Sequence, residues 1–452
     1  MIKNLIVFLF FNLLIYNYTN GQVNPHSKSE QDTLLINHNK TDYSEYEQHA
    51  KHLVDSVLQA EKQEKNCFLE NLLINQKIHL KYFNLPLDKL IDYNIYEGFR
   101  LGFGLTTNDG ISKYFSAGGY FGYGFKDKDW KYGGDLILNL HESSESKLHF
   151  SYSNDVKEKS AYSFLERSDF TTSEIYRNYM IENMDWIEKY ETTFSFLSLQ
   201  YLSTNLFFNQ SIVKPTDNYR YGETTSNLVN EFTFNEIAIQ FRYAYYEKFI
   251  QTSRTKFTQR NNYPILCANI IKGVTWLDGE YEYIKYEAKL TKLFKTKKLG
   301  NTKIAVVGGL INGDVPLSKL YNGHGSYQSF SLETENSFGT MRMGEFYSDK
   351  FFSVFFYHNF GNLFLKTELF APEFIVVHNY GIGTLSSKSN HSSNKPLQSV
   401  DKGFYEGGVL INNILNHSFF GYGFGIFYRY GPYSFDKTAD NFSYKLSLTI
   451  GL

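Results

Sequence analysis

From about residue 93 to the end of the chain, apolar and polar residues alternate with a period of two. In the first such stretch, Phe99, Leu101 and Phe103 share one face. Arg100 and Gly102 share the other face. Successive side chains of a β-strand point to opposite sides, so this alternation predicts strands with one aromatic and aliphatic face and one glycine-rich, charged face.

Two architectures use strands of this kind. A soluble sandwich buries its apolar face against a second sheet, whereas a membrane barrel turns that face to lipid and the polar face to a lumen. Tyr428 and Tyr430 lie near a strand end, where interfacial aromatics belong. Glycines on the polar face suit close packing and curvature. We therefore predict an all-β fold, a transmembrane antiparallel β-barrel over residues 92–452 with roughly 16 strands.

Two regions and the N-terminal part of the chain differ from this repeating pattern. Strand counts from the two ends give conflicting parity at 155–190 and 248–263, so at least one expected strand there must be wrong.

Residues 1–21 have the charge, apolar stretch and small residues of a secretory signal peptide. Residues 22–91 are expected to form a flexible and then helical periplasmic segment, with helical spacing over 43–80.

Composition and charge narrow the class of protein. Aromatic residues make up 18% of the chain and proline only 8 residues, which argues against a disordered chain. The net charge of −2 gives no basic field for nucleic acid. We expect export to the outer membrane, with membrane lipids and the barrel-assembly machinery as partners.

Several stretches resemble one known family. They are YNIYEGFRLGFGLTTND (93–109), GGYFGYGFKDKDWKYGGDL (118–136), GDVPLSKLYNGHGS (313–326), MRMGEFYSD (341–349) and FYRYGPYSFDKTADNFSYKLSLTIGL (427–452). Together they resemble the barrel region, of unknown function, of the carboxypeptidase-like regulatory-domain outer-membrane proteins of Bacteroidetes. In that family an N-terminal β-sandwich usually precedes the barrel, and here the segment 22–91 stands in its place. The family name refers to a non-catalytic domain, so the resemblance implies no carboxypeptidase activity.

A looser likeness is to the sixteen-stranded Omp85-type barrels of assembly and secretion. Those barrels fold a long loop between late strands back into the lumen, with a glycine-flanked basic motif. Residues 314–349 occupy a similar place in this chain. The likeness implies that this loop enters the lumen, and its candidate residues are Asn322, Gly323, His324, Gly325 and Arg342.

Charged residues of both signs lie at polar-face positions of the expected strands. They are Arg100, Asp135, Arg242, Lys285, Glu287, Lys366, Glu368, Glu406, Arg429 and Lys445. An ion-selective pore would favour one sign. We therefore expect these lumen-lining candidates to form ion pairs across a narrow or plugged lumen.

Motifs for catalysis or cofactor binding are not evident. The chain has no serine-nucleophile elbow, zinc-binding HExxH helix or phosphate loop, and we expect no enzyme activity and no cofactor. His324, Asp349 and His358 leave open a hydrolase on the extracellular rim, and a soluble glycan-binding β-protein is a further alternative. The basic run from Lys292 to Lys298 is either a solvated turn or a contact to lipid phosphates.

Overall fold

The computed structural model describes most of the chain after residue 76. The described residues are 77–165, 173–222, 228–251, 256–258, 262–296, 299–362, 367, 369–394, 396–417 and 420–450. The backbone divides into two compact units, Met1–Asp55 and Ser56–Leu452, and all described residues belong to the second. The expected signal peptide and the helical stretch up to residue 76 lie outside the described residues.

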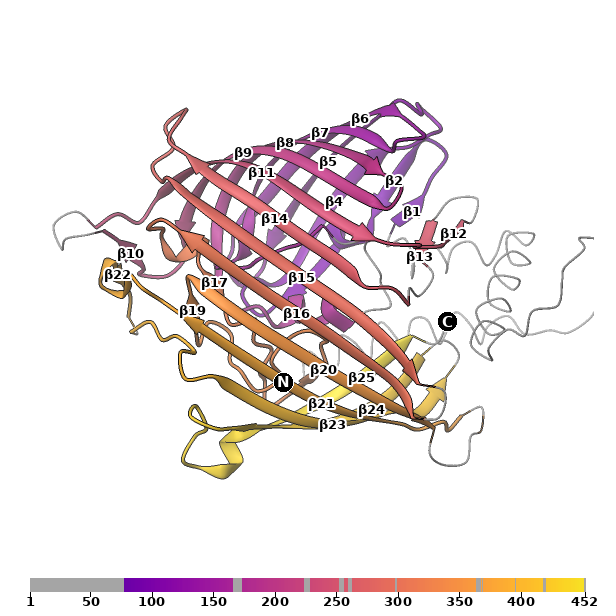
Figure 1. The fold of residues 1–452 in the computed structure, drawn as a ribbon. Helices are drawn as coiled ribbons and strands as arrows, with labels where there is room; N and C mark the ends of the chain where they lie inside the picture. Colours follow the sequence, from indigo (N-terminus) through magenta and orange to yellow (C-terminus); the bar gives the residue numbers. More distant parts are fainter. Residues whose placement is uncertain are drawn as a thin grey trace, which may run out of the picture. The chain divides into compact units, whose positions relative to one another are not determined.

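Strands of nine residues or more dominate the second unit, and the described residues contain fifteen of them. They are β4 (Gly98–Thr107), β5 (Phe115–Gly124), β6 (Trp130–His141), β7 (Ser146–Glu158), β8 (Met184–Leu199), β9 (Leu202–Pro215), β11 (Phe232–Ala244), β14 (Ile265–Val274), β15 (Tyr283–Thr296), β16 (Gly300–Asn312), β20 (Lys350–Asn362), β21 (Glu373–Thr384), β23 (Phe404–His417), β24 (Phe420–Tyr430) and β25 (Phe442–Ile450). Each pairs antiparallel with the next in this order, as Figure 1 shows. The predicted all-β antiparallel architecture is confirmed.

An interrupted strand precedes β4. It consists of β2 (Phe83–Pro86), the 3-10 turn η1 (Leu87–Lys89) and β3 (Ile91–Asn94). Both β2 and β3 pair antiparallel with β4, so the series of antiparallel strands reaches sixteen, the number expected from chain length. β1 (Lys77–His79) pairs with β2, and the expected helix is therefore wrong for these residues. The free edge of β2 offers a row of backbone hydrogen-bonding groups, with which β1 pairs as a strand.

The two regions of conflicting parity contain connections rather than extra long strands. β7 and β8 are joined by residues 159–183, which include the 3-10 helix η2 (Ser173–Met180). β11 and β14 are joined by a connection that holds the short pair β12 (Phe249–Gln251) and β13 (Lys256–Thr258). Counting one strand on each side of these connections restores the alternation of strand direction along the sheet.

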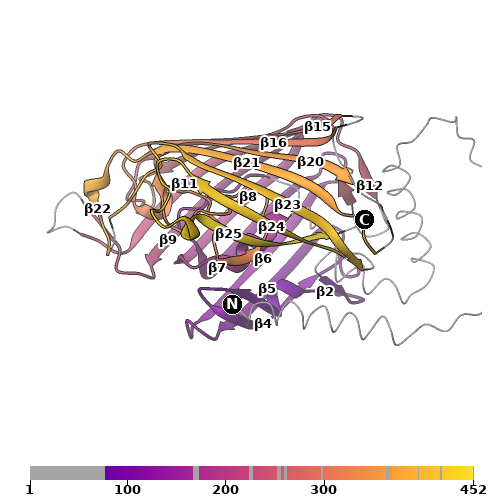
Figure 2. The same ribbon diagram turned by 90° about the horizontal axis from the view of Figure 1, so that it is seen from below.

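Connections differ between the two rims of the sheet. One rim has the tight turns between β6 and β7, β8 and β9, and β15 and β16, and we call it the short-turn rim. The opposite rim has the connections β7–β8, β16–β20 and β21–β23, and we call it the long-loop rim. The sheet bends round so that β4 and β5 lie on one side of the view in Figure 2 and β15 and β16 on the other.

The last long strand, β25, has an unusual neighbour. On one edge it pairs antiparallel with β24. On its other edge, β18 (Phe330–Leu332) pairs with it in parallel, with Ser331 opposite Lys445. In the residue registers of the described part of the chain, β25 pairs with β24 and β18, and β4 pairs with β2, β3 and β5. A segment from an interior connection therefore covers part of the edge that a first strand would otherwise meet.

The two faces of the sheet have opposite character. On the outer face, Phe103 is 45% exposed and Phe121 50% exposed. On the inner face, Lys131 and Lys445 are at most 1% exposed. The alternation in the sequence thus assigns side chains to the correct faces. Among the helices that the structure describes, none is both long and apolar enough to cross a membrane.

Candidate functional site

The connection between β16 and β20, residues 314–349, packs against the inner face, and we call it the inner loop. It contains η3 (Leu317–Lys319), β17 (Tyr321–Asn322), β18 and β19 (Tyr347–Ser348). β17 and β19 pair with each other, so the loop has a hairpin-like base near the long-loop rim. Much of it is buried, including Ser326, Ser337 and Met341.

Glu406 of β23 holds the inner loop to the wall of the sheet. Its carboxylate accepts hydrogen bonds from the backbone N–H groups of Gly339 and Thr340, at 2.9 and 2.8 Å. The Thr340 hydroxyl and the Asn379 amide also donate to it, at 2.6 and 2.7 Å. A Cβ at Gly339 would lie 3.2 Å from the Phe427 ring, so a larger residue would push the two N–H groups away from the carboxylate. Four donors thus satisfy a carboxylate that has no exposed surface.

Two cations of the neighbouring strands also contact the inner loop. The Arg429 guanidinium of β24 lies 2.8 Å from the Glu345 carboxylate. The Lys445 ammonium of β25 donates to the Ser326 carbonyl and the Ser331 hydroxyl, both at 2.8 Å. Glu406, Arg429 and Lys445 come from three adjacent strands, so the loop is fixed along a continuous part of the wall.

A second connection, residues 159–183, fixes the inner loop from the opposite side. Arg177 donates from Nε to the Gly325 carbonyl at 3.0 Å and forms a bidentate pair with Glu158. The Asn322 amide donates to the same Glu158 carboxylate at 2.8 Å and to the Lys159 carbonyl at 2.9 Å. The two connections therefore share one buried polar network.

The glycines and the histidine of the NGHG stretch lie where these connections meet. A Cβ at Gly325 would lie 2.3 Å from the Met341 carbonyl, and one at Gly323 would lie 2.3 Å from the Met341 sulfur. His324 has a φ of +53° and stacks on Tyr162 with ring centroids 5.0 Å apart. Burial, and then the nearby Arg177, lowers the pKa of the His324 imidazole well below its usual value. The ring is therefore neutral, and its Nδ1 makes no hydrogen bond within the described part of the chain.

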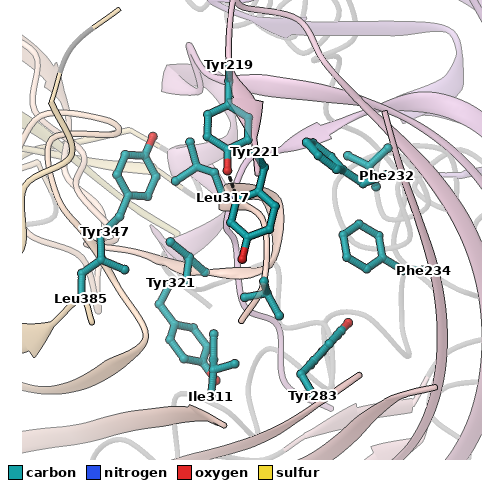
Figure 3. Packing of buried hydrophobic residues seen from close by; sticks show 13 residues of the cluster. Tyr219, Tyr221, Phe232, Phe234, Tyr283, Ile311, Leu317, Tyr321, Tyr347 and Leu385 are labelled. Atoms are coloured by element: carbon teal, nitrogen blue, oxygen red, sulfur yellow. Dashed lines mark hydrogen bonds between the residues drawn. The ribbon is translucent and has the colours of Figure 1, made fainter. Parts of the chain in front are cut away.

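An aromatic cluster closes the space around the base of the inner loop (Figure 3). The Tyr219 hydroxyl accepts a hydrogen bond from the Leu317 backbone N–H at 2.8 Å. The same hydroxyl lies 2.7 Å from Nδ1 of His391, in the β21–β23 connection. Burial lowers the pKa of His391 to about 4, so this contact is made by a neutral imidazole. Further buried members of the cluster are Tyr221, Phe232, Phe234, Tyr283, Ile311, Val315, Leu320, Tyr321, Tyr347 and Leu385.

Most other lumen-lining candidates have partners on the wall itself. Arg100 pairs with Asp155 at 2.6 Å and with Glu97. Arg242 pairs with Glu247. The Arg100–Asp155 pair joins β4 to β7 over the two strands that lie between them, whereas Glu97 and Glu247 lie in the turns next to the strands of their partners. The expected ion pairs across the lumen stay a prediction.

Lys285 and Asp135 complete the described candidates. Lys285 pairs with Glu287 at 3.0 Å on the same strand, and its ammonium lies 4.4 Å from the ring centre of Tyr321 in the inner loop. Asp135 is half-buried on the inner face of β6. Lys366 and Glu368 lie outside the described residues.

Arg342, the basic residue of the predicted loop motif, does not reach the wall. It is exposed, and its guanidinium lies over the rings of Phe435 at 4.6 Å and Tyr327 at 5.5 Å. The ion pair with the wall is made instead by Glu345, three residues further on. No local sequence pattern marks Glu345, Gly339, Thr340 or Arg177, because their partners lie far away in the chain.

The residues considered for catalysis are not brought together. The Asp349 carboxylate accepts a hydrogen bond from the Ser386 backbone N–H at 2.8 Å, whereas the His324 ring stacks on Tyr162. Nδ1 of His358, near the far end of β20, lies 2.8 Å from the Thr302 hydroxyl. Within the described ranges, no group of three His, Cys, Asp or Glu side chains is arranged to hold a metal ion.

Comparisons with known proteins place the chain in a family. It belongs to the family of unknown function DUF5686, whose C-terminal domain matches residues 71–391. No curated protein matches the sequence.

Solved structures with similar folds include two kinds of protein. BamA from Haemophilus ducreyi lacking POTRA domains 1–3 has 10% identity and a TM-score of 0.47, covering 79% of this chain and 68% of that chain. CdiB from Escherichia coli has 8% identity and a TM-score of 0.44, covering 80% and 61%. CdiB from Acinetobacter baumannii has 10% identity and a TM-score of 0.40, covering 80% and 58%. The chain thus spans about three-fifths of the length of the two CdiB chains.

Proposed function

We propose that the protein is a non-enzymatic outer-membrane β-barrel whose inner loop fills part of the lumen, and that it acts in transport, envelope assembly or surface display. One observation carries this proposal. Charged side chains such as Glu406 and Arg429 are buried on the inner face, while large apolar side chains such as Leu101 and Val409 are about half exposed on the outer face.

This distribution differs from that in a soluble protein, where charged residues are mostly exposed and extended apolar surfaces are covered. It suits a bilayer, because a cation on the lipid-facing side near the midplane costs roughly 2–4 kcal/mol. The soluble glycan-binding alternative would leave the aromatic outer face in water. The outer-membrane hydrolase lacks support as well, because His324, Asp349 and His358 make their contacts with different partners.

Membrane fractionation tests the location. After a carbonate wash the mature chain should stay with outer-membrane lipids, because the exposed aromatic face keeps it in the bilayer. Unboiled samples should also migrate faster on gels than boiled ones, since a hydrogen-bonded barrel resists unfolding by detergent. Recovery of the folded chain from the soluble periplasm would contradict the proposal.

Single-channel recording tests whether the inner loop acts as a plug. Replacing 314–349 by a short glycine and serine linker should raise the conductance in planar bilayers, because the loop and its anchors occupy the inner face of β20 to β25. Asp135→Ala, which leaves every contact of the loop intact, serves as the control and should leave the conductance of the loop-containing protein low. A correctly folded deletion with unchanged conductance would rule out the plug.

A further inference from the structure

A group of tyrosines and lysines lies on the outer face at the short-turn rim, and we call it the Tyr/Lys patch. It consists of Tyr245, Tyr246, Lys248, Tyr263 and Lys292. The Tyr245 and Tyr263 rings pack edge to face with centroids 5.0 Å apart, and Tyr246 lies 6.1 Å from each of them. The three tyrosines are between 43% and 50% exposed, so their packing against one another leaves much of each ring accessible.

The two ammonium groups of the patch are held against these rings. Lys248 Nζ lies 5.3 Å from the Tyr246 centroid, and Lys292 Nζ lies 6.0 Å from that of Tyr263. Lys292 also donates to the Asn262 carbonyl at 2.6 Å, which fixes the direction of its side chain. An ammonium has three N–H donors, and this bond uses one of them.

The acid of the same connection does not neutralise the patch. Glu247 follows Tyr246 directly, but its carboxylate is bound to Arg242 in a pair whose side chains are at most 6% exposed. Lys248, by contrast, is exposed. The patch therefore presents two positive charges framed by phenol rings.

The surroundings of the patch indicate which part of the membrane it contacts. Leu206, Leu266 and Leu290, on the strands that lead to it, are each 41% to 43% exposed and form an apolar surface on the same outer face. Tyrosine and lysine at the border of such a surface are typical of the depth at which lipid headgroups lie. In bacterial barrels short turns face the periplasm, where the facing leaflet consists of phospholipid.

From this arrangement we infer that the Tyr/Lys patch binds the phosphate of an acidic phospholipid in the periplasmic leaflet. The two ammonium groups supply charge complementarity, and the exposed Tyr246 hydroxyl supplies a further hydrogen-bond donor. A plain aromatic girdle would hold the barrel at the interface without preferring one headgroup charge. The inference rests on the proposed membrane function and adds a ligand class to it.

Titration with lipid tests the inference on the full mature chain, refolded in neutral detergent. Phosphatidylglycerol and phosphatidylcholine are added separately, and bound lipid is counted by native mass spectrometry. Phosphatidylglycerol should bind in a saturable manner and more tightly than phosphatidylcholine, and added salt should weaken it. Lys248→Gln with Lys292→Gln should bind phosphatidylglycerol about tenfold more weakly.

Lys272→Gln with Lys437→Gln is the matched control, because both lysines are well exposed and lie at the long-loop rim. It removes the same charge and should bind phosphatidylglycerol like the unmodified protein. Equal weakening in both double variants, or equal affinity for the two lipids, would overturn the inference. Gel migration of unboiled samples monitors folding in parallel, and the single variant Lys248→Gln replaces the double one if the latter misfolds. If the folded barrel shows no headgroup preference, only the lipid site is contradicted. If the chain fails to insert into vesicles, the proposed function is contradicted as well.

Discussion

The inner face of the sheet is polar both on β6 and β7 and on β23 to β25, but its burial differs greatly between these regions. In the middle of β6 and β7, Asp135, Ser151 and Ser153 are half-buried, whereas Lys131 and Asp155, nearer the long-loop rim, are buried. On β23 and β25, Glu406 and Lys445 are at most 1% exposed. The difference arises because the inner loop covers the second region. Alternation along a strand therefore decides which face a side chain takes, while a distant segment decides whether that face meets water.

The two regions also satisfy their charges differently. Arg100 and Asp155 pair between strands of the wall, so their partners belong to the sheet itself. Glu406 and Arg429 are next to each other in the β23–β24 register, yet their hydrogen bonds go to the inner loop. Removing the loop would take away most of the partners of these two charges and would expose both side chains to the lumen. The covered region thus depends on the loop, and the β6–β7 region does not.

The largest expected effect comes from Glu406→Ala. It leaves the N–H groups of Gly339 and Thr340 and the Asn379 amide without their acceptor in a region sealed from water. We expect a loss of about 3–5 kcal/mol in the free energy of unfolding. Asp135→Ala, on the half-buried region, should cost less than about 1 kcal/mol. Denaturant titration in detergent micelles measures both, and equal losses would end the distinction between the two regions.

The next effect is a pH dependence that arises from a carboxyl group of the covered region. Burial, and then the nearby Glu335, raise the pKa of Glu333, beside β18, from 4.5 to about 7, although Ser173, Tyr357 and Lys445 oppose the rise. A raised pKa means that the folded protein binds the proton more tightly than the unfolded chain does. The stabilisation is therefore complete below about pH 4.5 and is lost as the pH rises through about 7.

Glu333→Gln should flatten this pH dependence, because an amide does not titrate. The unmodified protein should lose on the order of 2 kcal/mol relative to this variant between pH 4.5 and 8. Unfolding midpoints measured across that range give the comparison. A Glu333→Gln profile parallel to that of the unmodified protein would show that the carboxyl group is not responsible.

A smaller effect is expected from the pair that joins wall to loop. A double-mutant cycle on Arg429→Met and Glu345→Gln should give a coupling energy of about 1–2 kcal/mol, since the Arg429 side chain is buried. Conductance should rise in the Arg429 variant as the loop loosens. The same cycle on Arg100 and Asp155 should give a similar coupling energy without a change in conductance. A conductance change in both cycles would contradict the separation of the two regions.

The smallest effect is expected at Arg342. Its guanidinium lies over two aromatic rings at an exposed position, where such contacts contribute about 0.5–1 kcal/mol. Arg342→Ala should therefore lower the free energy of unfolding by no more than about 1 kcal/mol and leave the conductance unchanged. A loss as large as that of Glu406→Ala would show that the loop is held by its basic residue rather than by the wall.

The strand faces were predictable because side-chain direction follows the local period of two. Phe103 and Lys131 illustrate this, since each lies on the face that its neighbours imply. The covering of Glu406 could not be predicted in the same way, because its partners Gly339 and Thr340 are more than sixty residues away. The strand at Lys77–His79 was missed for a related reason. A segment of three residues fits either period, and its pairing with β2 decides the outcome.

The parallel pairing of β18 with β25 has a consequence for the order in which the chain folds. β24 and β25 form a local hairpin, but the other edge of β25 is completed by residues 114 positions earlier, as the contact between Lys445 and Ser331 shows. Closing so long a stretch is entropically costly and slow compared with hairpin formation. The parallel pairing of β18 is therefore expected to form after the β24–β25 hairpin. A growing chain that has not reached residue 444 can already hold its inner loop by Glu406, Arg429 and Arg177, and only the last strand supplies the remaining contacts of β18.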